Sequence, residues 1–78
     1  MSEYYIFGNG QFAELISHIL LDEHKIKKEN LFFVVNKYIN KNDHILEKDF
    51  FKIKNKNLKV FIGIGDIKKR QEIIKKLS

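Results

Sequence analysis

Residues 4–16, with the sequence YYIFGNGQFAELI, decide the fold because they combine three different local signals in one short stretch. Residues 4–7 form an apolar, β-prone run, which predicts a buried strand. The run ends at Gly8-Asn9-Gly10, which is a strong turn signal. Beyond the turn, apolar residues recur with the spacing of one helix face, at Phe12, Leu15, Ile16, Ile19 and Leu20. The stretch therefore predicts a strand, a tight turn and a helix from about Gln11 to Asp22.

The turn carries a phosphate-binding pattern. Gly8-Asn9-Gly10-Gln11-Phe12-Ala13 fits G-x-G-x-x-G/A and lies between a strand and a helix, as it does in dinucleotide-binding folds. Gly8 permits the tight turn, Gly10 leaves room for a diphosphate beside the backbone, and Ala13 lets the helix pack closely on the strand. The unpaired N–H groups at the helix start then face the anion. The pattern favours phosphate or nucleotide binding, with a purely structural turn as the alternative.

The rest of the chain continues the alternation of strand and helix. Residues 31–35 form an unbroken apolar run, which is typical of a strand covered on both faces, and residues 58–64 predict a third strand. Between them, Ile45-Leu46 is a candidate for a very short strand, and residues 47–53 predict a short helix. Asp66 precedes a last helix, with apolar residues at Ile67, Ile74 and Leu77.

This order of elements predicts an α/β fold, a small Rossmann-like half-domain of three layers that spans residues 1–78. We expect a three-stranded parallel sheet in the order 2-1-3, with strands near residues 4–7, 31–35 and 58–63. Right-handed crossovers should place the helices against the sheet.

A second glycine loop, Gly63-Ile64-Gly65-Asp66, closes the third predicted strand. Ligands of parallel α/β sheets bind beyond the carboxyl ends of the strands, so this loop should border the same crevice as the first. Asp66 is either a helix N-cap or a ligand contact. Arg70 follows one turn later, at the spacing of an ion pair with Asp66.

The second strand ends in Val34-Val35-Asn36-Lys37, where a dinucleotide-binding domain usually has an acidic residue for a ribose hydroxyl. The missing carboxylate weakens an NAD-binding interpretation. Asn36 can still hydrogen-bond to a sugar or a base, and Lys37 is either solvated or a phosphate contact. The candidate substrate-binding residues are therefore Gly8, Asn9, Gly10, Gln11, Asn36, Gly63, Gly65 and Asp66.

Length and composition exclude several classes of protein, including disulfide-linked and membrane-spanning ones. The chain has 78 residues and no cysteine, so it is at most one domain and has no disulfide or zinc-thiolate cluster. No apolar run approaches the roughly 18 residues that span a membrane, and no signal-peptide pattern is present, so we expect a cytoplasmic protein without membrane insertion. His18, His24 and His44 lack metal-ligand spacing. No nucleophile–base pair is evident, so we predict neither a metal site nor a catalytic residue.

The net charge of +5 is unevenly distributed. Residues 1–24 contain four acidic residues and no Lys or Arg, whereas residues 25–78 contain all fifteen basic residues and six acidic ones. A basic excess fits either a polyanionic partner or a solvated surface, and the interspersed acids favour the surface. No platform of aromatic and basic residues is evident, so nucleic acid is not a predicted partner.

Three segments resemble the N-terminal domain of bacterial sugar acetyltransferases of the PglD/NeuD type: YYIFGNGQFAELI at 4–16, LFFVVNK at 31–37 and VFIGIGDIKKRQEIIKKL at 60–77. The most specific match is the family's I-G-D/N-x-x-x-R pattern, present as Ile64-Gly65-Asp66 and Arg70. The resemblance implies a Rossmann-like half that binds the UDP-sugar acceptor. It also implies a separate left-handed β-helix half, which forms a trimer, binds acetyl-CoA and supplies the catalytic histidine.

The chain departs from the family pattern at both ligand-side loops. The first loop of the family usually reads G-x-G-G-H, and here Gln11 and Phe12 replace the Gly and His. The second strand of the family usually ends in two Asp residues, and here they are Val35 and Asn36. The β-helix half is absent from these 78 residues, so we expect no cofactor in this chain and no acetyl transfer by it alone.

We therefore expect a nucleotide-sugar-binding domain that serves a sugar acetyltransferase of surface-glycan biosynthesis. A β-helix acyltransferase domain or chain would be its partner. Two alternatives stay open: a structural or interaction module of the same fold that has lost its ligand, and a dinucleotide-binding domain.

Overall fold

A computed structural model describes residues 2–53 and 57–77 of the chain. Strands and helices alternate in it much as the apolar runs indicate. The elements are β1 (Glu3–Phe7), α1 (Gln11–Asp22), the 3-10 helix η1 (Lys28–Asn30), β2 (Leu31–Val35), β3 (His44–Leu46), α2 (Glu47–Phe50), β4 (Leu58–Ile62) and α3 (Ile67–Leu77).

The sheet is parallel throughout and has four strands in the order β3-β2-β1-β4. The prediction of a sheet with only three strands is therefore wrong, because β3 adds an edge strand beside β2. The three predicted strands are neighbours in the order β2-β1-β4, and the full order of the sheet is 3-2-1-4. This strand has only three residues, which pair Phe33 with His44, Val34 with Ile45 and Val35 with Leu46. Two apolar residues after a polar segment are too few to show a period, so their pairing with β2, rather than any local pattern, makes them a strand.

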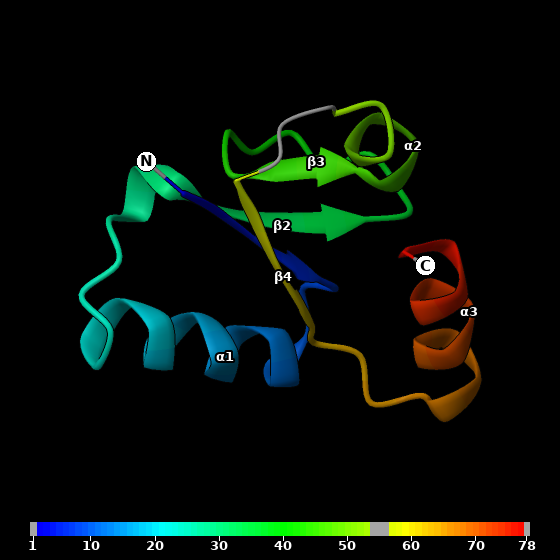
Figure 1. Cartoon of the computed structure of the whole chain (residues 1–78), viewed down its shortest axis with the longest axis horizontal. Coiled ribbons are helices and arrows are strands. Elements are labelled where there is room, and N and C mark those ends of the chain that lie inside the picture. Colours follow the sequence, from blue (N-terminus) through cyan, green and yellow to red (C-terminus); the bar gives the residue numbers. More distant parts are fainter. Residues whose placement is uncertain (1, 54–56, 78) are drawn as a thin grey trace.

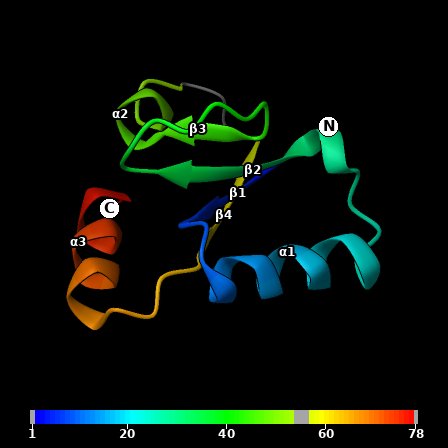
Figure 2. The same cartoon turned by 180° about the vertical axis from the view of Figure 1, so that it is seen from behind.

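The central strand β1 sends alternate side chains to two separate clusters, one on each face of the sheet. Tyr5 and Phe7 pack with Phe50 of α2 and Ile73 of α3, whereas Ile6 packs with residues of α1. In Figure 1, α1 runs along one side of the sheet, α2 lies on the other, and α3 stands beside the tips of β2 and β3; Figure 2 shows the same layers from behind. The sheet is thus covered on both faces, and the three-layer arrangement is confirmed.

Helix α1 has the predicted bounds, but its buried face is rotated from the predicted one and shares only Ile16 and Leu20 with it. Its buried residues are Ala13, Ser17 and Leu20, whereas Phe12, Leu15 and Ile19 of the predicted inner face are 45%, 57% and 40% exposed. The buried Ser17 hydroxyl is satisfied within the helix, because it donates a hydrogen bond to the carbonyl oxygen of Glu14 at 2.6 Å. Ala13 and Ser17 on this face are small, which lets α1 lie very close to the sheet.

Helix α3 shows the same kind of rotation. Ile73 is its buried residue, whereas the three apolar residues whose spacing predicted the helix, Ile67, Ile74 and Leu77, remain partly or largely exposed. Helix α2 is shorter than the predicted segment 47–53, yet it still buries Phe50. No helix in residues 2–53 and 57–77 has the length and apolar character needed to cross a membrane.

Candidate functional site

The loop between β1 and α1 depends on the backbone freedom of Gly8. This residue has a φ of +102°, in the region that favours glycine. Its N–H donates a hydrogen bond to the carbonyl oxygen of Val34 at 2.8 Å, which holds the loop against the end of β2. A Cβ atom at Gly8 would lie 3.0 Å from the Gly63 carbonyl oxygen and 3.0 Å from Cγ1 of Ile64. The tight turn expected at Gly8 is therefore present, and it packs closely against the second glycine loop at Gly63 and Ile64.

Gly10 differs from Gly8 because its missing side chain borders open space. It is the N-cap of α1, with a φ of −84° that any residue adopts. A Cβ atom there would meet nothing within 4 Å. The first helical hydrogen bond runs from the Glu14 N–H to the Gly10 carbonyl oxygen at 2.9 Å. The N–H groups that precede Glu14 in the first turn have no carbonyl of the preceding turn to bond.

Gly63 and Ala13 set the distance between α1 and the end of β4. A Cβ atom at Gly63 would lie 2.7 Å from Cα and 2.8 Å from Cβ of Ala13, closer than side chains tolerate. The expectation that Ala13 permits close packing of helix and strand is confirmed, and its counterpart is Gly63. The Gly63 N–H also donates to the carbonyl oxygen of Phe7 at 2.9 Å. The sequence predicted Gly63 only as a ligand contact, whereas the structure also gives it a role in packing α1 against β4.

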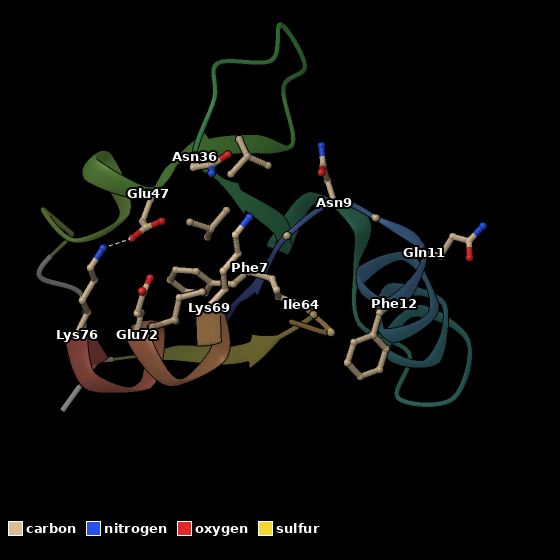
Figure 3. A pocket seen from close by; sticks show the side chains of 17 residues that line it. Phe7, Asn9, Gln11, Phe12, Asn36, Glu47, Ile64, Lys69, Glu72 and Lys76 are labelled. Carbon is tan, nitrogen blue, oxygen red and sulfur yellow. Dashed lines mark hydrogen bonds and ion pairs between the residues drawn. The ribbon is translucent and has the colours of Figure 1, made fainter. Parts of the chain in front are cut away.

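The loop ends converge on one cleft of about 660 Å³ at the carboxyl ends of the strands. The segments that follow β1, β2 and β4 form one part of its lining, with residues Phe7–Phe12, Val34–Asn36 and Gly63–Gly65. Every candidate binding residue except Asp66 therefore borders the same space. In Figure 3 the Asn36 side chain lies at the cleft, whereas the Gln11 side chain points away from its centre. The juxtaposition of the two glycine loops and Asn36 is as expected.

Asp66 lies outside the lining of the cleft and acts as a helix cap. Its Oδ1 accepts a hydrogen bond from the Lys69 backbone N–H at 3.2 Å, and its carbonyl oxygen accepts one from the Arg70 N–H at 3.0 Å. Of the two roles considered for Asp66, the geometry supports the N-cap. Arg70 reaches Asp66 through this backbone bond, and the described side chains form no ion pair between the two.

Helices α2 and α3 add lining residues that the sequence analysis missed, namely Glu47, Lys69, Glu72, Ile73 and Lys76. Figure 3 shows Lys76 reaching across to Glu47, where its ammonium nitrogen lies 2.8 Å from Oε1. This hydrogen bond, with the charge of Glu47, raises the pKa of Lys76 above its ordinary value. The two residues are 29 positions apart, so no local sequence pattern predicts that they form a pair. The sequence did contain one signal for these lining residues: the spacing of Lys69, Glu72 and Lys76 places them on one side of α3.

The cleft is equipped for binding through hydrogen bonds and charge. Apolar side chains such as Phe7 and Ile73 form part of its wall, and the amides of Asn9 and Asn36 and the charged side chains of α2 and α3 supply polar groups. Among the described residues, none that lines the cleft carries an imidazole, thiol or hydroxyl group. Among the residues that the structure describes, no group of three or more His, Cys, Asp or Glu side chains is placed to hold a metal ion.

Comparison with known proteins gives a family match. No curated protein and no solved structure matches the chain. Residues 3–77 match the family described as the PglD N-terminal domain, which covers nearly all of the 78 residues. The four-stranded parallel sheet with two glycine loops at its carboxyl end is thus found in a chain that belongs to the PglD N-terminal domain family, the N-terminal domain of PglD-type sugar acetyltransferases.

Proposed function

We propose that this domain binds a UDP-sugar in the cleft at the carboxyl ends of its strands. The observation that carries the proposal is the convergence of three separate segments, Gly8–Gln11, Asn36 and Gly63–Gly65, on one space. A volume of about 660 Å³ lies within the range of small-molecule sites, roughly 300–1,000 Å³. Partly apolar walls with a few polar groups are also typical of such sites.

In this proposal the diphosphate lies against the first glycine loop. Gly10 offers open space where a side chain would otherwise project, and the first turn of α1 offers unpaired backbone N–H groups. Asn36, at the end of β2, has an amide that both donates and accepts hydrogen bonds, which suits the uracil or the ribose. The proposal does not rest on Asp66, which lies outside the lining of the cleft and caps α3.

The domain would serve a sugar acetyltransferase by presenting the acceptor. The acyl chemistry, with acetyl-CoA and the catalytic histidine, would belong to a β-helix domain or chain, as the family relationship implies. Surface-glycan biosynthesis is the corresponding proposed pathway. The lining residues favour binding over catalysis, because they offer backbone amides, side-chain amides and paired charges.

Titration calorimetry with UDP, UDP-N-acetylglucosamine and NAD tests the proposal on the purified chain. We expect both UDP compounds to bind and NAD to bind more weakly, because no carboxylate follows Val35 for the ribose hydroxyl. Gly10→Val should abolish binding, since its methyl groups would fill the space beside the loop. The fold should survive, because a Cβ atom at Gly10 meets nothing within 4 Å.

The control for Gly10→Val is Asp66→Ala, which changes a residue outside the lining of the cleft and removes the cap on the Lys69 backbone N–H. Thermal melts of both variants separate lost binding from lost folding. If wild-type protein binds no UDP compound at millimolar concentration, the proposed function is wrong and the structural-module alternative replaces it. Tighter binding of NAD than of UDP would instead support the dinucleotide alternative.

A further inference from the structure

Among the described residues that line the cleft, the charged side chains divide into a paired group and one cation that forms no ion pair. Lys76 contacts Glu47 at 2.8 Å, and the charge of Glu72 further favours its ammonium form. Two carboxylates and one ammonium group therefore share the end of the cleft between α2 and α3. The net charge of these three groups is negative, so this end of the cleft repels a phosphate group.

Lys69 is the remaining charged side chain of the lining. Its backbone N–H is used by Asp66, at 3.2 Å. Its ammonium group has no ion-pair partner among residues 2–53 and 57–77. In Figure 3 the Lys69 side chain rises from α3 toward the space between Asn36 and the first glycine loop. An exposed lysine is ordinarily solvated, but this one projects beside the loop whose glycine leaves room for an anion.

We infer that Lys69 pairs with the phosphate groups of the bound nucleotide, and that its charge makes the cleft prefer a nucleoside diphosphate over a monophosphate. This inference rests on the proposed function, because it assigns a residue to the same cleft. An ammonium group binds phosphate as a compact charge and complements the backbone N–H groups at the start of α1. The carboxylates of Glu47 and Glu72 then leave the opposite end of the cleft to the uncharged part of the ligand.

Sequence position alone does not assign this role to Lys69. The residue occupies one of the variable positions of the I-G-D/N-x-x-x-R pattern, between Asp66 and Arg70. Its neighbour Lys68 is also exposed, carries the same charge and lies outside the lining of the cleft. The chain thus offers a matched control one residue away.

The experiment measures the affinities of UDP, UMP and uridine for the wild type, Lys69→Gln and Lys68→Gln by titration calorimetry. Loss of a charge-assisted contact should weaken UDP binding by about tenfold or more in Lys69→Gln. UMP should lose less and uridine almost nothing, because the contact is to phosphate. Lys68→Gln should match the wild type within about twofold, since its charge is screened by solvent. Lys69→Arg should retain most of the preference for UDP.

The slope of UDP affinity against salt concentration is a second readout that a merely structural lysine would not change. It should be shallower in Lys69→Gln than in Lys68→Gln. Wild-type UDP affinity in Lys69→Gln would overturn the inference and leave the proposed function standing. Equal losses in both variants would also overturn it, since the effect would then be general surface charge. If the wild type binds none of the three compounds, the proposed function fails, and the role of Lys69 fails with it.

Discussion

The glycines of the two loops differ in what an added methyl group would meet. Gly63→Ala should be the most damaging, because the new Cβ atom would lie 2.7 Å from the backbone of Ala13. Overpacking of this kind costs about 1–3 kcal/mol or more. Gly8→Ala forces a side chain into a positive φ, at about 1–2 kcal/mol. Gly10→Ala should cost less than about 1 kcal/mol, the difference between Gly and Ala as an N-cap.

Urea denaturation of the three variants checks this order. Gly10→Ala is the internal control, because it makes the same Gly-to-Ala replacement without a steric clash. Stability losses of equal size at all three positions would contradict it. So would a Gly63→Ala variant as stable as the wild type, since α1 would then lie farther from β4 than the structure places it.

Asp66 provides a second test at the scale of one side chain. Its Oδ1 satisfies the backbone N–H of Lys69, so Asp66→Ala should lower stability by about 0.5–2 kcal/mol through loss of the cap. Asp66→Asn retains a capping oxygen and should recover most of the loss. Thermal melts of the two variants provide the measurement. Equal destabilisation by Ala and Asn would show that the charge, rather than the cap, is what matters.

Helix α2 shows how a very short element contributes to the core. It has four residues, too few to be stable alone, and it is held by Phe50, which is 4% exposed. The Phe50 ring lies 5.1 Å from that of Tyr5 and 5.0 Å from that of Phe7, in edge-on contacts. Tertiary packing on the sheet, rather than helix propensity, therefore keeps α2 in place.

Phe50→Ala should cost about 3–5 kcal/mol, a large part of the total stability of so small a domain. Phe51→Ala is the matched control, because the neighbouring ring is 39% exposed and should cost much less. Chemical denaturation followed by circular dichroism compares them, and Phe50→Leu replaces Phe50→Ala if the latter does not fold. Similar losses for Phe50 and Phe51 would contradict the burial of α2 described above.

At the scale of the whole molecule, the stability should fall in alkali because of Tyr5 in the central strand. Burial, followed by the charge of Glu3 and its hydrogen bond with the Tyr5 hydroxyl, raises the pKa of Tyr5 from 10.0 to about 12. The folded state thus favours the neutral phenol. This contribution is complete below about pH 10 and is lost as the pH rises toward about 12, by about 3 kcal/mol in all.

Urea midpoints measured between about pH 9 and pH 12 test this expectation. Tyr5→Phe should flatten the alkaline fall, because phenylalanine has no proton to lose. Lys76, whose pKa is also raised, acts in the same direction and remains in both proteins. A fall of equal steepness in Tyr5→Phe would show that Tyr5 is not its source.

Much of the fold follows from local sequence. The run at residues 4–7 and the glycines after it are sufficient to predict β1, the turn and the bounds of α1, because periodicity and turn chemistry act over a few residues. The same reasoning places β2, β4 and the start of α3. It also brings Asn36 and the two glycine loops to one edge of the sheet, because parallel strands end together.

Tertiary structure decided what these local patterns do not encode. The edge strand β3 forms because its three residues pair with β2, and the inner face of α1 is rotated to include Ala13 and Ser17 because Gly63 brings helix and sheet into close contact. Lys69 and Glu72 join the cleft, and Lys76 meets Glu47 there, because α3 folds back beside the strand ends. Period and composition describe single elements, whereas these contacts depend on the distance and rotation between elements, which are set when the layers pack together.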